Sequence, residues 1–290
     1  MRIVSLVPSA SEIICDLGLK KSLVAVSHEC NYPASLNKLP IITSSSIDNS
    51  LPQIQIDNLV RTKVAENKSL YEINDQLLND LAPDTIITQG VCDVCAVSDN
   101  QVEATLKGQL CTLSAETEII SLNGRSFDGI CIDIKTLGKK LNKEKEASLI
   151  IDNANAEKEI MLSEEKSDIR VLCLEWIDPY FSAGHWVPEQ IEMAGFVSAI
   201  GNPGDQSRVL TVDEIMESKP DVIAVICCGY SDKENEVFAH ELLNDKNLSN
   251  LSPIKQSKVF SFDSDSYFSR PTLRIIEGAK QLREKVLTSI

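Results

Sequence analysis

Residues 2–18 of this chain, RIVSLVPSASEIICDLG, decide its fold class. The apolar run at 2–7 predicts a buried strand, and the stretch from Pro8 to Glu12 supplies the residue types that favour a helix start. We expect a helix over 13–17, ended by the glycine that follows it. A buried strand leading directly into a helix is the building unit of an α/β fold.

A second half of the chain repeats this order. It contains a predicted strand at 170–174 and a predicted helix at 187–194, and both helices have a proline near their start and a glycine after their end. In each half a helix is also followed by Pro-Asp and a continuous apolar strand, at 83–88 and at 220–226. Strands without polar alternation are typical of parallel sheets covered by helices on both faces. Further strands are predicted at 23–26, 109–113 and 258–262, which completes two similar α/β halves.

The segment between the halves has a different pattern. Residues 127–166 contain no proline, and apolar residues recur at helical spacing among many Lys and Glu, which predicts one or two long helices. Residues 43–75 form a polar connection with a short helix, in which 68–73 folds back as a strand or a turn. We therefore expect three parts: an N-terminal α/β lobe at 1–123, a linking helix at 124–167 and a C-terminal α/β lobe at 168–290.

Charge and composition exclude several classes of protein. The 290 residues carry 28 Lys and Arg against 43 Asp and Glu, a formal net charge of 28 − 43 = −15, and the pI is near 4.7. Such a chain lacks the basic face that binding to nucleic acid or to an anionic membrane surface requires. No apolar run reaches the length of about 18 residues that a membrane span needs.

The N-terminus and the cysteines bear on location. The predicted first strand starts at residue 2, and neither an apolar region of about 7–15 residues nor a small-residue cleavage site precedes it, so no signal peptide is visible. The nine cysteines are odd in number and irregularly spaced, which favours reduced thiols. The sequence therefore predicts a cytoplasmic protein.

Residues that could carry chemistry gather after the predicted strands. Ligands of open α/β sheets lie beyond the carboxyl ends of the strands, and both tryptophans, two of the three histidines and five of the nine cysteines fall there. The sequence has no nucleophile elbow, Walker loop or dinucleotide-binding glycine motif, so no catalytic residue is predicted. The candidate ligand-binding residues are Pro8, Ser9, His28, Glu29, Cys30, Tyr32, Gln89, Cys92, Trp176, His185, Trp186, Cys228, Tyr267, Phe268 and Arg270.

The Cys92-x-x-Cys95 pair allows several interpretations. The two thiols can pack a strand-to-helix turn as small apolar residues, contact a ligand, or form a metal or redox site. No second Cys-x-x-Cys exists to complete a structural zinc site. The candidate ligands for zinc or another transition metal are Cys92, Cys95, His28 and His185.

The loop that carries His185 is rich in aromatic neighbours. Gly184-His185-Trp186 follows Trp176, Tyr180 and Phe181, and it can present an imidazole beside flat apolar surfaces or fold over a small core of its own. A large planar or metal-bearing ligand would suit the first arrangement. Arg270 can clamp a carboxylate or an amide, or cap a helix or a carbonyl.

In their order along the chain, these motifs resemble the periplasmic cobalamin-binding and siderophore-binding proteins of importer systems. The resemblance covers essentially the whole chain and rests on residues 2–12, the two Pro-Asp strands and Tyr-Phe-Ser-Arg-Pro at 267–271. It implies two Rossmann-like lobes with parallel sheets joined by a long spanning helix at 127–166, with the ligand held between the lobes. Three further stretches are similar to a subgroup described as cobalamin-binding proteins: 27–33, 92–97 and 175–189.

The resemblance implies a binding protein that holds a corrinoid, such as cobalamin, or a similar metal-bearing small molecule. Trp176, Trp186, Tyr32 and Tyr267 would supply flat contact surface, and His185 or His28 would reach the metal or the ring amides.

Two other readings stay open. One is a metal-binding or thiol-dependent protein or enzyme that uses Cys92 and Cys95, and the other is a protein–protein adaptor that has lost its ligand. We expect a small-molecule ligand as the partner, with no nucleic acid and no membrane insertion. Because no export signal is visible, we expect no docking on an importer permease.

Overall fold

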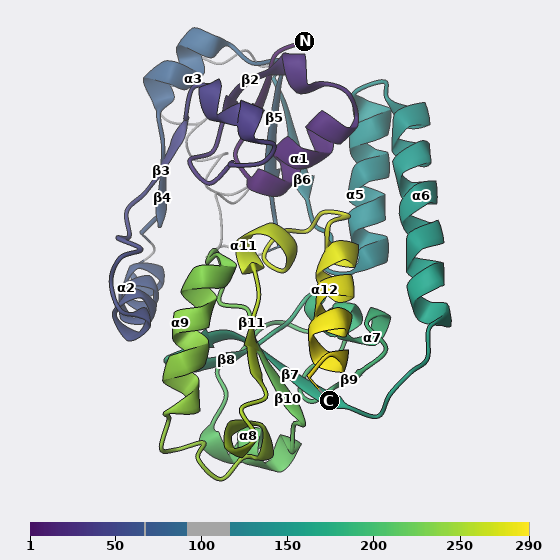
Figure 1. The fold of residues 1–290 in the computed structure, drawn as a ribbon. Coiled ribbons are helices and arrows are strands. Elements are labelled where there is room, and N and C mark those ends of the chain that lie inside the picture. Colours follow the sequence, from purple (N-terminus) through teal and green to yellow (C-terminus); the bar gives the residue numbers. More distant parts are fainter. Residues whose placement is uncertain (67, 92–116, 290) are drawn as a thin grey trace. The chain divides into compact units, whose positions relative to one another are not determined.

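The computed structural model describes residues 1–66, 68–91 and 117–289, which form two compact units (Figure 1). Unit 1 comprises Met1–Gly124 and Asp128–Ile151, and unit 2 comprises Arg125–Phe127 and Asp152–Ile290. The helical segment that follows the first sheet is thus shared between the units, and neither unit is one continuous stretch of chain. Within the described ranges, no helix combines the length and the apolar character needed to cross a membrane.

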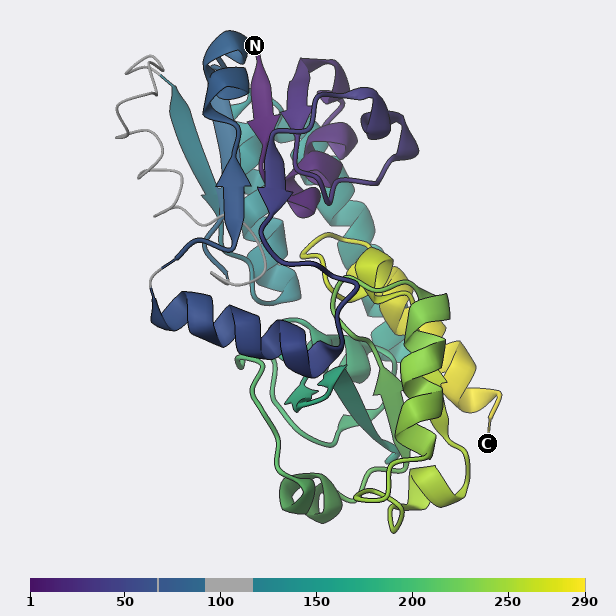
Figure 2. The same cartoon turned by 90° about the vertical axis from the view of Figure 1, so that its left-hand side faces the viewer.

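Unit 1 is built on a four-stranded parallel sheet in the order β2-β1-β5-β6 (Figures 1 and 2). Three of its strands confirm the prediction. The fourth, β6, is not among the predicted strands, and the strand expected at 109–113 lies outside the described residues. Every residue of β1 and β5 is buried, as expected for strands covered on both faces. The strands are β1 (Ile3–Ser5), β2 (Leu23–Val26), β5 (Thr85–Gln89) and β6 (Glu118–Leu122).

The first helix, α1 (Pro8–Asp16), begins five residues earlier than the sequence indicates. No side chain caps its N-terminus; Pro8 instead occupies the first turn, where its fixed φ suits the helix and its missing N–H removes no hydrogen bond. The Ser11 hydroxyl donates to the Ser5 hydroxyl at the end of β1 (2.9 Å) and so is used for packing rather than for capping. The expected N-cap residues therefore lie inside the helix.

A small antiparallel sheet of β3 (Thr43–Ser45) and β4 (Tyr71–Ile73) completes the strands of unit 1. β4 confirms the strand alternative for 68–73, whereas β3 is polar and gave no strand signal. The helix expected between them is α2 (Gln53–Ala65). Two short 3-10 turns are also present, at Lys20–Ser22 and Ala34–Lys38.

The core of unit 1 includes a cluster between the parallel sheet and α3 (Asp75–Leu81). Leu78 of α3 packs there with Val4 and Ile86 of the central strands, and Tyr71 of β4 lies against the same cluster. The small sheet is thereby tied to the large one, which places Thr43 beside the loop that leaves β2.

The segment predicted as one or two long helices contains two, which run antiparallel (Figure 1). They are α5 (Phe127–Lys140) and α6 (Glu144–Ser163). A Cβ on Gly138 would lie only 2.6 Å from the Cβ of Ala147, so the missing side chain allows the two helices to approach closely.

Unit 2 has a mainly parallel sheet in the order β11-β10-β7-β8, with β9 beside β7 (Figure 1). The predicted strands at 170–174, 220–226 and 258–262 are confirmed. The added feature is an antiparallel return, in which β8 pairs with the end of β7. The strands are β7 (Arg170–Ile177), β8 (Tyr180–Ser182), β9 (Val197–Ser198), β10 (Val222–Val225) and β11 (Val259–Ser261).

Helices surround this second sheet, and the predicted one at 187–194 is confirmed as α7 (Val187–Met193). A buried cluster of unit 2 joins Leu172 and Leu174 of β7 to Ile223 and Val225 of β10. The remaining helices are α8 (Val212–Ser218), α9 (Asp232–Leu243), α10 (Ser252–Lys255), α11 (Ser264–Tyr267) and α12 (Ile275–Leu287).

Candidate functional site

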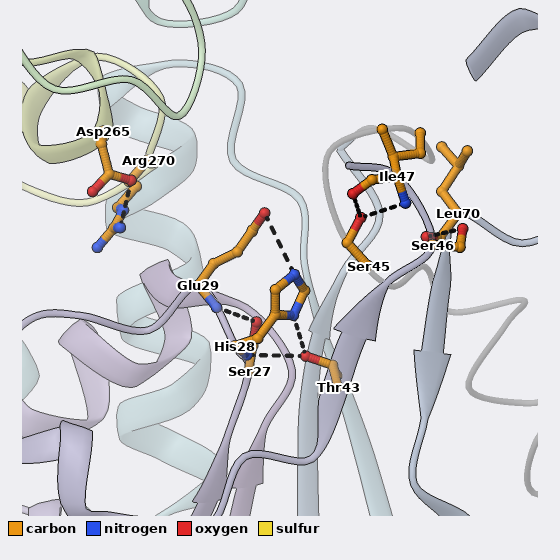
Figure 3. A network of polar contacts seen from close by, with 10 residues as sticks. All are labelled: Ser27, His28, Glu29, Thr43, Ser45, Ser46, Ile47, Leu70, Asp265 and Arg270. Carbon is orange, nitrogen blue, oxygen red and sulfur yellow. Dashed lines mark hydrogen bonds and ion pairs between the residues drawn. The ribbon is translucent and has the colours of Figure 1, made fainter. Parts of the chain in front are cut away.

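His28 lies in the loop at the carboxyl end of β2 (Figure 3). Its backbone N–H donates to the Thr43 hydroxyl (3.1 Å), and its ring Nδ1 lies 2.8 Å from the same oxygen. Its Nε2 is buried and has no hydrogen-bond partner among the described residues, while Glu29 Oε1 lies 3.9 Å away. The Tyr71 ring packs beside the imidazole, with 5.9 Å between ring centroids. Thr43 therefore fixes the direction in which Nε2 points.

The electrostatic state of His28 suits a role as a ligand. Burial lowers its pKa from the ordinary value of 6.5, so the imidazole is neutral at neutral pH. When Nδ1–H donates to Thr43, Nε2 carries the lone pair and can bind a metal; when the Thr43 hydroxyl donates to Nδ1, Nε2 is a donor toward Glu29 or a ligand amide.

The β3–β4 sheet in turn holds Thr43 in place (Figure 3). Thr43 is buried and pairs with Ile73 across the sheet. Beyond β3 the chain is held by serine hydroxyls: Ser45 bonds both the N–H and the carbonyl of Ile47, and Ser46 donates to the Leu70 carbonyl (2.7 Å). These contacts fix the chain that leaves the strand carrying Thr43.

Cys30 has a packing role in this loop. Its Sγ lies 3.1 Å from the Ser11 hydroxyl, and because the Ser11 proton goes to Ser5, the thiol is the donor. The Ser5 hydroxyl in turn donates to the Val7 carbonyl (2.9 Å). Cys30 thus links the His28 loop to the start of α1.

The other candidates of unit 1 differ in exposure. Pro8 and Ser9 form the start of α1, where Ser9 is buried, and Gln89 is buried at the end of β5. Tyr32 is exposed and precedes a cis bond to Pro33. Within unit 1, Tyr32 is therefore the candidate with the most accessible aromatic surface.

His185 lies in the loop between β8 and α7 of unit 2. It adopts a left-handed backbone conformation, with φ of 55°, which is uncommon for a residue with a side chain. Its N–H donates to the Asp205 carbonyl (2.6 Å), and its carbonyl accepts from the Gly204 N–H (2.8 Å). Burial, and secondly the charge of Arg125, lowers the pKa of His185, so this imidazole too is neutral at neutral pH.

Trp186 is a structural residue within unit 2. Only 6% of its surface is exposed, and its indole N–H donates to the Phe268 carbonyl (2.8 Å). Trp176 is half-buried and packs on Tyr230, with 5.8 Å between ring centroids. The flat surface expected from the two tryptophans is therefore offered mainly by Trp176.

The backbone of the loop at 267–270 is fixed by hydrogen bonds from buried side chains. Gln190 of α7 is fully buried and donates to the Tyr267 carbonyl (3.0 Å) and to the Ile275 carbonyl (2.9 Å). Phe268 is buried, and Tyr267 packs under the Arg274 guanidinium, 4.8 Å from the ring centroid. The Tyr267 backbone is thereby fixed.

Arg270 is engaged within its own loop. It is buried and donates to the Asp265 carboxylate (2.6 Å), as Figure 3 shows. This ion pair ties the end of the loop to α11.

A buried asparagine positions the Cys228 loop. The Asn235 side chain accepts from the Cys227 N–H (2.9 Å) and donates to the carbonyls of Tyr230 and Phe262. Cys228 itself is half-buried, and its N–H donates to the Glu175 carbonyl (3.1 Å).

The metal and thiol hypothesis gains no support from the described part of the chain. Cys92 and Cys95 lie outside the described residues. Among those that are described, no group of three or more His, Cys, Asp or Glu side chains could hold a metal ion.

Sequence reasoning missed the residues that orient the candidates. Thr43, Gln190 and Asn235 act through hydrogen bonds to residues that lie 5 to 85 positions away in the chain. Polar residues at the ends of short elements carry no periodic signal, so only the folded backbone reveals these contacts.

Burial of the two histidines predicts a dependence of stability on pH. The folded-state pKa values of both histidines lie below 6.5. At a pH between these lowered values and 6.5, the unfolded chain therefore binds protons at the two histidines and the folded chain does not. The free energy of unfolding should therefore fall as the pH drops from about 7 to about 5.5. Urea denaturation at several pH values measures this slope.

The control is the third histidine, His240, which is exposed on α9. A His28→Gln, His185→Gln double variant should flatten the slope, whereas His240→Gln should leave it as in the parent. An unchanged slope in the double variant would show that neither buried imidazole resists protonation.

Comparison with known proteins identifies the class. The family model described as periplasmic binding protein matches residues 3–266, and the chain belongs to this family. Its two α/β units with parallel strands are the fold of that family. Among curated proteins no match was found.

Solved structures share the fold at low sequence identity. The periplasmic vitamin B12-binding protein BtuF of Vibrio cholerae is 20% identical, with a TM-score of 0.67 and coverage of 99% of this chain and 97% of that one. The periplasmic heme-binding protein HutB of Vibrio cholerae is 17% identical, with a TM-score of 0.73 and coverage of 99% and 98%. An ABC transporter substrate-binding protein from Listeria monocytogenes is 16% identical, with a TM-score of 0.73 and coverage of 98% and 97%. The description of this last relative runs against our expectation that permease docking is absent.

Proposed function

We propose that this protein binds a metal-bearing tetrapyrrole, and specifically a corrinoid, through residues that follow strands of its sheets. The observation that carries the proposal is the pair of half-buried imidazoles, His28 and His185. Each follows a strand of a central sheet, and burial keeps each neutral. Neutral imidazole is the form that coordinates transition metals.

Three further observations support the proposal. The relatives that share the fold include proteins described as binding vitamin B12 and heme. Tyr32, which is exposed, and Trp176, which is half-buried, both offer flat apolar surface. Along the chain, Tyr32 follows His28 closely and Trp176 precedes His185. Aromatic surfaces with a few fixed polar groups are the usual lining of sites for large planar ligands. We propose a corrinoid rather than heme because 27–33 and 175–189 resemble the corresponding stretches of cobalamin-binding proteins.

The test is titration of the purified protein with aquocobalamin and, separately, with hemin, followed by absorbance and calorimetry. Aquocobalamin has an exchangeable axial water, so coordination by an imidazole shifts its visible bands. We expect micromolar or tighter binding of aquocobalamin, and a band shift that His28→Ala or His185→Ala abolishes. His240→Ala is the matched control and should change neither affinity nor spectrum.

Each outcome has a defined meaning. Tight binding without any band shift would retain the corrinoid and remove the imidazoles as metal ligands. Stronger binding of hemin than of aquocobalamin would overturn the corrinoid assignment. Absence of heat and of spectral change with both compounds would overturn the proposed function.

A further inference from the structure

Glu175 is placed by an irregularity in its strand. β7 and β8 pair Leu174 with Ser182 and Trp176 with Phe181, so two steps along β7 match one step along β8. Glu175 is therefore the extra residue of a β-bulge. Bulges redirect a side chain and are frequent beside functional sites.

The redirected carboxylate joins two loops. Its Oε1 accepts from the Gly184 N–H (3.2 Å), and its Oε2 accepts from the Ser207 hydroxyl (2.5 Å). Gly184 directly precedes His185 in the first loop, and Ser207 belongs to the second loop, at 202–207. A single side chain thus bonds both segments.

The two loops are in close backbone contact. A Cβ on Gly184 would lie 2.4 Å from the Ser207 nitrogen and 2.8 Å from the Asp205 carbonyl oxygen, so only glycine allows this approach. The second loop also bonds both backbone groups of His185, through Asp205 and Gly204. The left-handed conformation of His185 is therefore maintained by the loop that Glu175 holds.

We propose that Glu175 is a positioning residue for His185: it joins the 202–207 loop to Gly184 and so sets the direction of the imidazole. The inference rests on the proposed function insofar as His185 is a ligand-binding residue. On this proposal Glu175 acts on the ligand through His185. Groups that orient a metal-binding histidine without touching the metal are typically worth about 10–100-fold in affinity.

The first measurement does not need a ligand. The protein has three histidines, so a long-range proton–nitrogen NMR spectrum of the imidazoles contains three side-chain patterns, and His28→Ala, His185→Ala and His240→Ala assign them. Glu175→Ala should move the His185 resonances and leave those of His28 and His240 in place. Glu175→Gln, which can still accept from Gly184 and bond Ser207, should restore the parent pattern.

Two further variants complete the design. Ser207→Ala removes one of the two contacts while Glu175 remains, and it should shift His185 in the same direction as Glu175→Ala; it also serves if Glu175→Ala does not fold. Glu192→Ala, at an exposed position of α7, is the matched control and should leave all three imidazoles unchanged. Unshifted His185 resonances in folded Glu175→Ala and Ser207→Ala would overturn the inference.

The second measurement connects the inference to the ligand. Aquocobalamin affinity should fall by about tenfold or more in Glu175→Ala, but Glu175→Ala should add no loss in a His185→Ala background. Additive losses would show that Glu175 acts independently of His185 and would overturn the inference. If the parent binds no tetrapyrrole, the proposed function fails while the NMR result still decides the positioning role.

Discussion

Replacement of Trp186 by alanine is expected to lower the free energy of unfolding by about 3–5 kcal/mol. The indole is almost fully buried in unit 2, and its N–H is bonded to the Phe268 carbonyl. The substitution leaves a large cavity and a buried carbonyl without its donor, and both effects act in the same direction. Urea denaturation of the parent and the variant measures the change.

Trp186→Phe separates the two effects. It retains most of the apolar volume but loses the N–H, so we expect a loss of about 1–2 kcal/mol, close to the value of one hydrogen bond. If Trp186→Ala instead kept the parent stability and only weakened ligand binding, the indole would be a ligand contact rather than part of the core.

Replacement of Glu189 by alanine is expected to destabilise the protein by about 3 kcal/mol, the lower end of the range for breaking a buried ion pair, because it leaves a largely buried lysine without its counter-charge. Glu189 of α7 accepts from Lys158 of α6 and from the Phe127 N–H at the start of α5, both at 2.7 Å. The side chains of Glu189 and Lys158 are only 15% and 17% exposed. Lys158 also lies 4.3 Å from the centroid of the Phe127 ring.

Helix α6, which carries Lys158, also provides a matched control. Glu157 and Lys280 form an ion pair of the same 2.7 Å length, but their side chains are 51% and 44% exposed. Glu157→Ala should therefore cost only about 0–1 kcal/mol. A Glu189→Gln, Lys158→Met double variant should recover most of the loss, because it leaves no unpaired buried charge. Equal losses for Glu189→Ala and Glu157→Ala would contradict the assigned role of burial.

The sequence was sufficient for the central strands of the two sheets because these strands carry a strong signal, whereas β6 and β8 were not predicted. The run after Pro220-Asp is continuously apolar and the run after Pro83-Asp lacks polar alternation, a pattern typical of strands buried on both faces. β3 was missed because it consists of only three residues, Thr43–Ser45, and all of them are polar. The helix start at Pro8 was misplaced because the serines that resemble caps make tertiary contacts instead.

The sequence selects candidate residues by their place after predicted strands, but it does not show what their side chains contact. Topology brings His28 and Trp176 to the carboxyl ends of the parallel strands β2 and β7. His185 instead follows the antiparallel return β8, which was not predicted. The direction of each side chain depends on distant partners such as Thr43. Trp186 illustrates the limit, because nothing in an aromatic-rich loop shows which ring turns inward.

The shared helical segment has a consequence for synthesis of the chain. Phe127 belongs to unit 2, and its hydrogen-bond partner Glu189 is translated 62 residues after it. At roughly 5–20 residues per second, the ribosome needs about 3–12 s to bridge that gap. During this time the remainder of α5 can join the completed strands of unit 1, while its first turn still lacks the carboxylate that will accept from it. The order of translation therefore allows unit 1 to form first, and the arrival of α7 completes the start of α5.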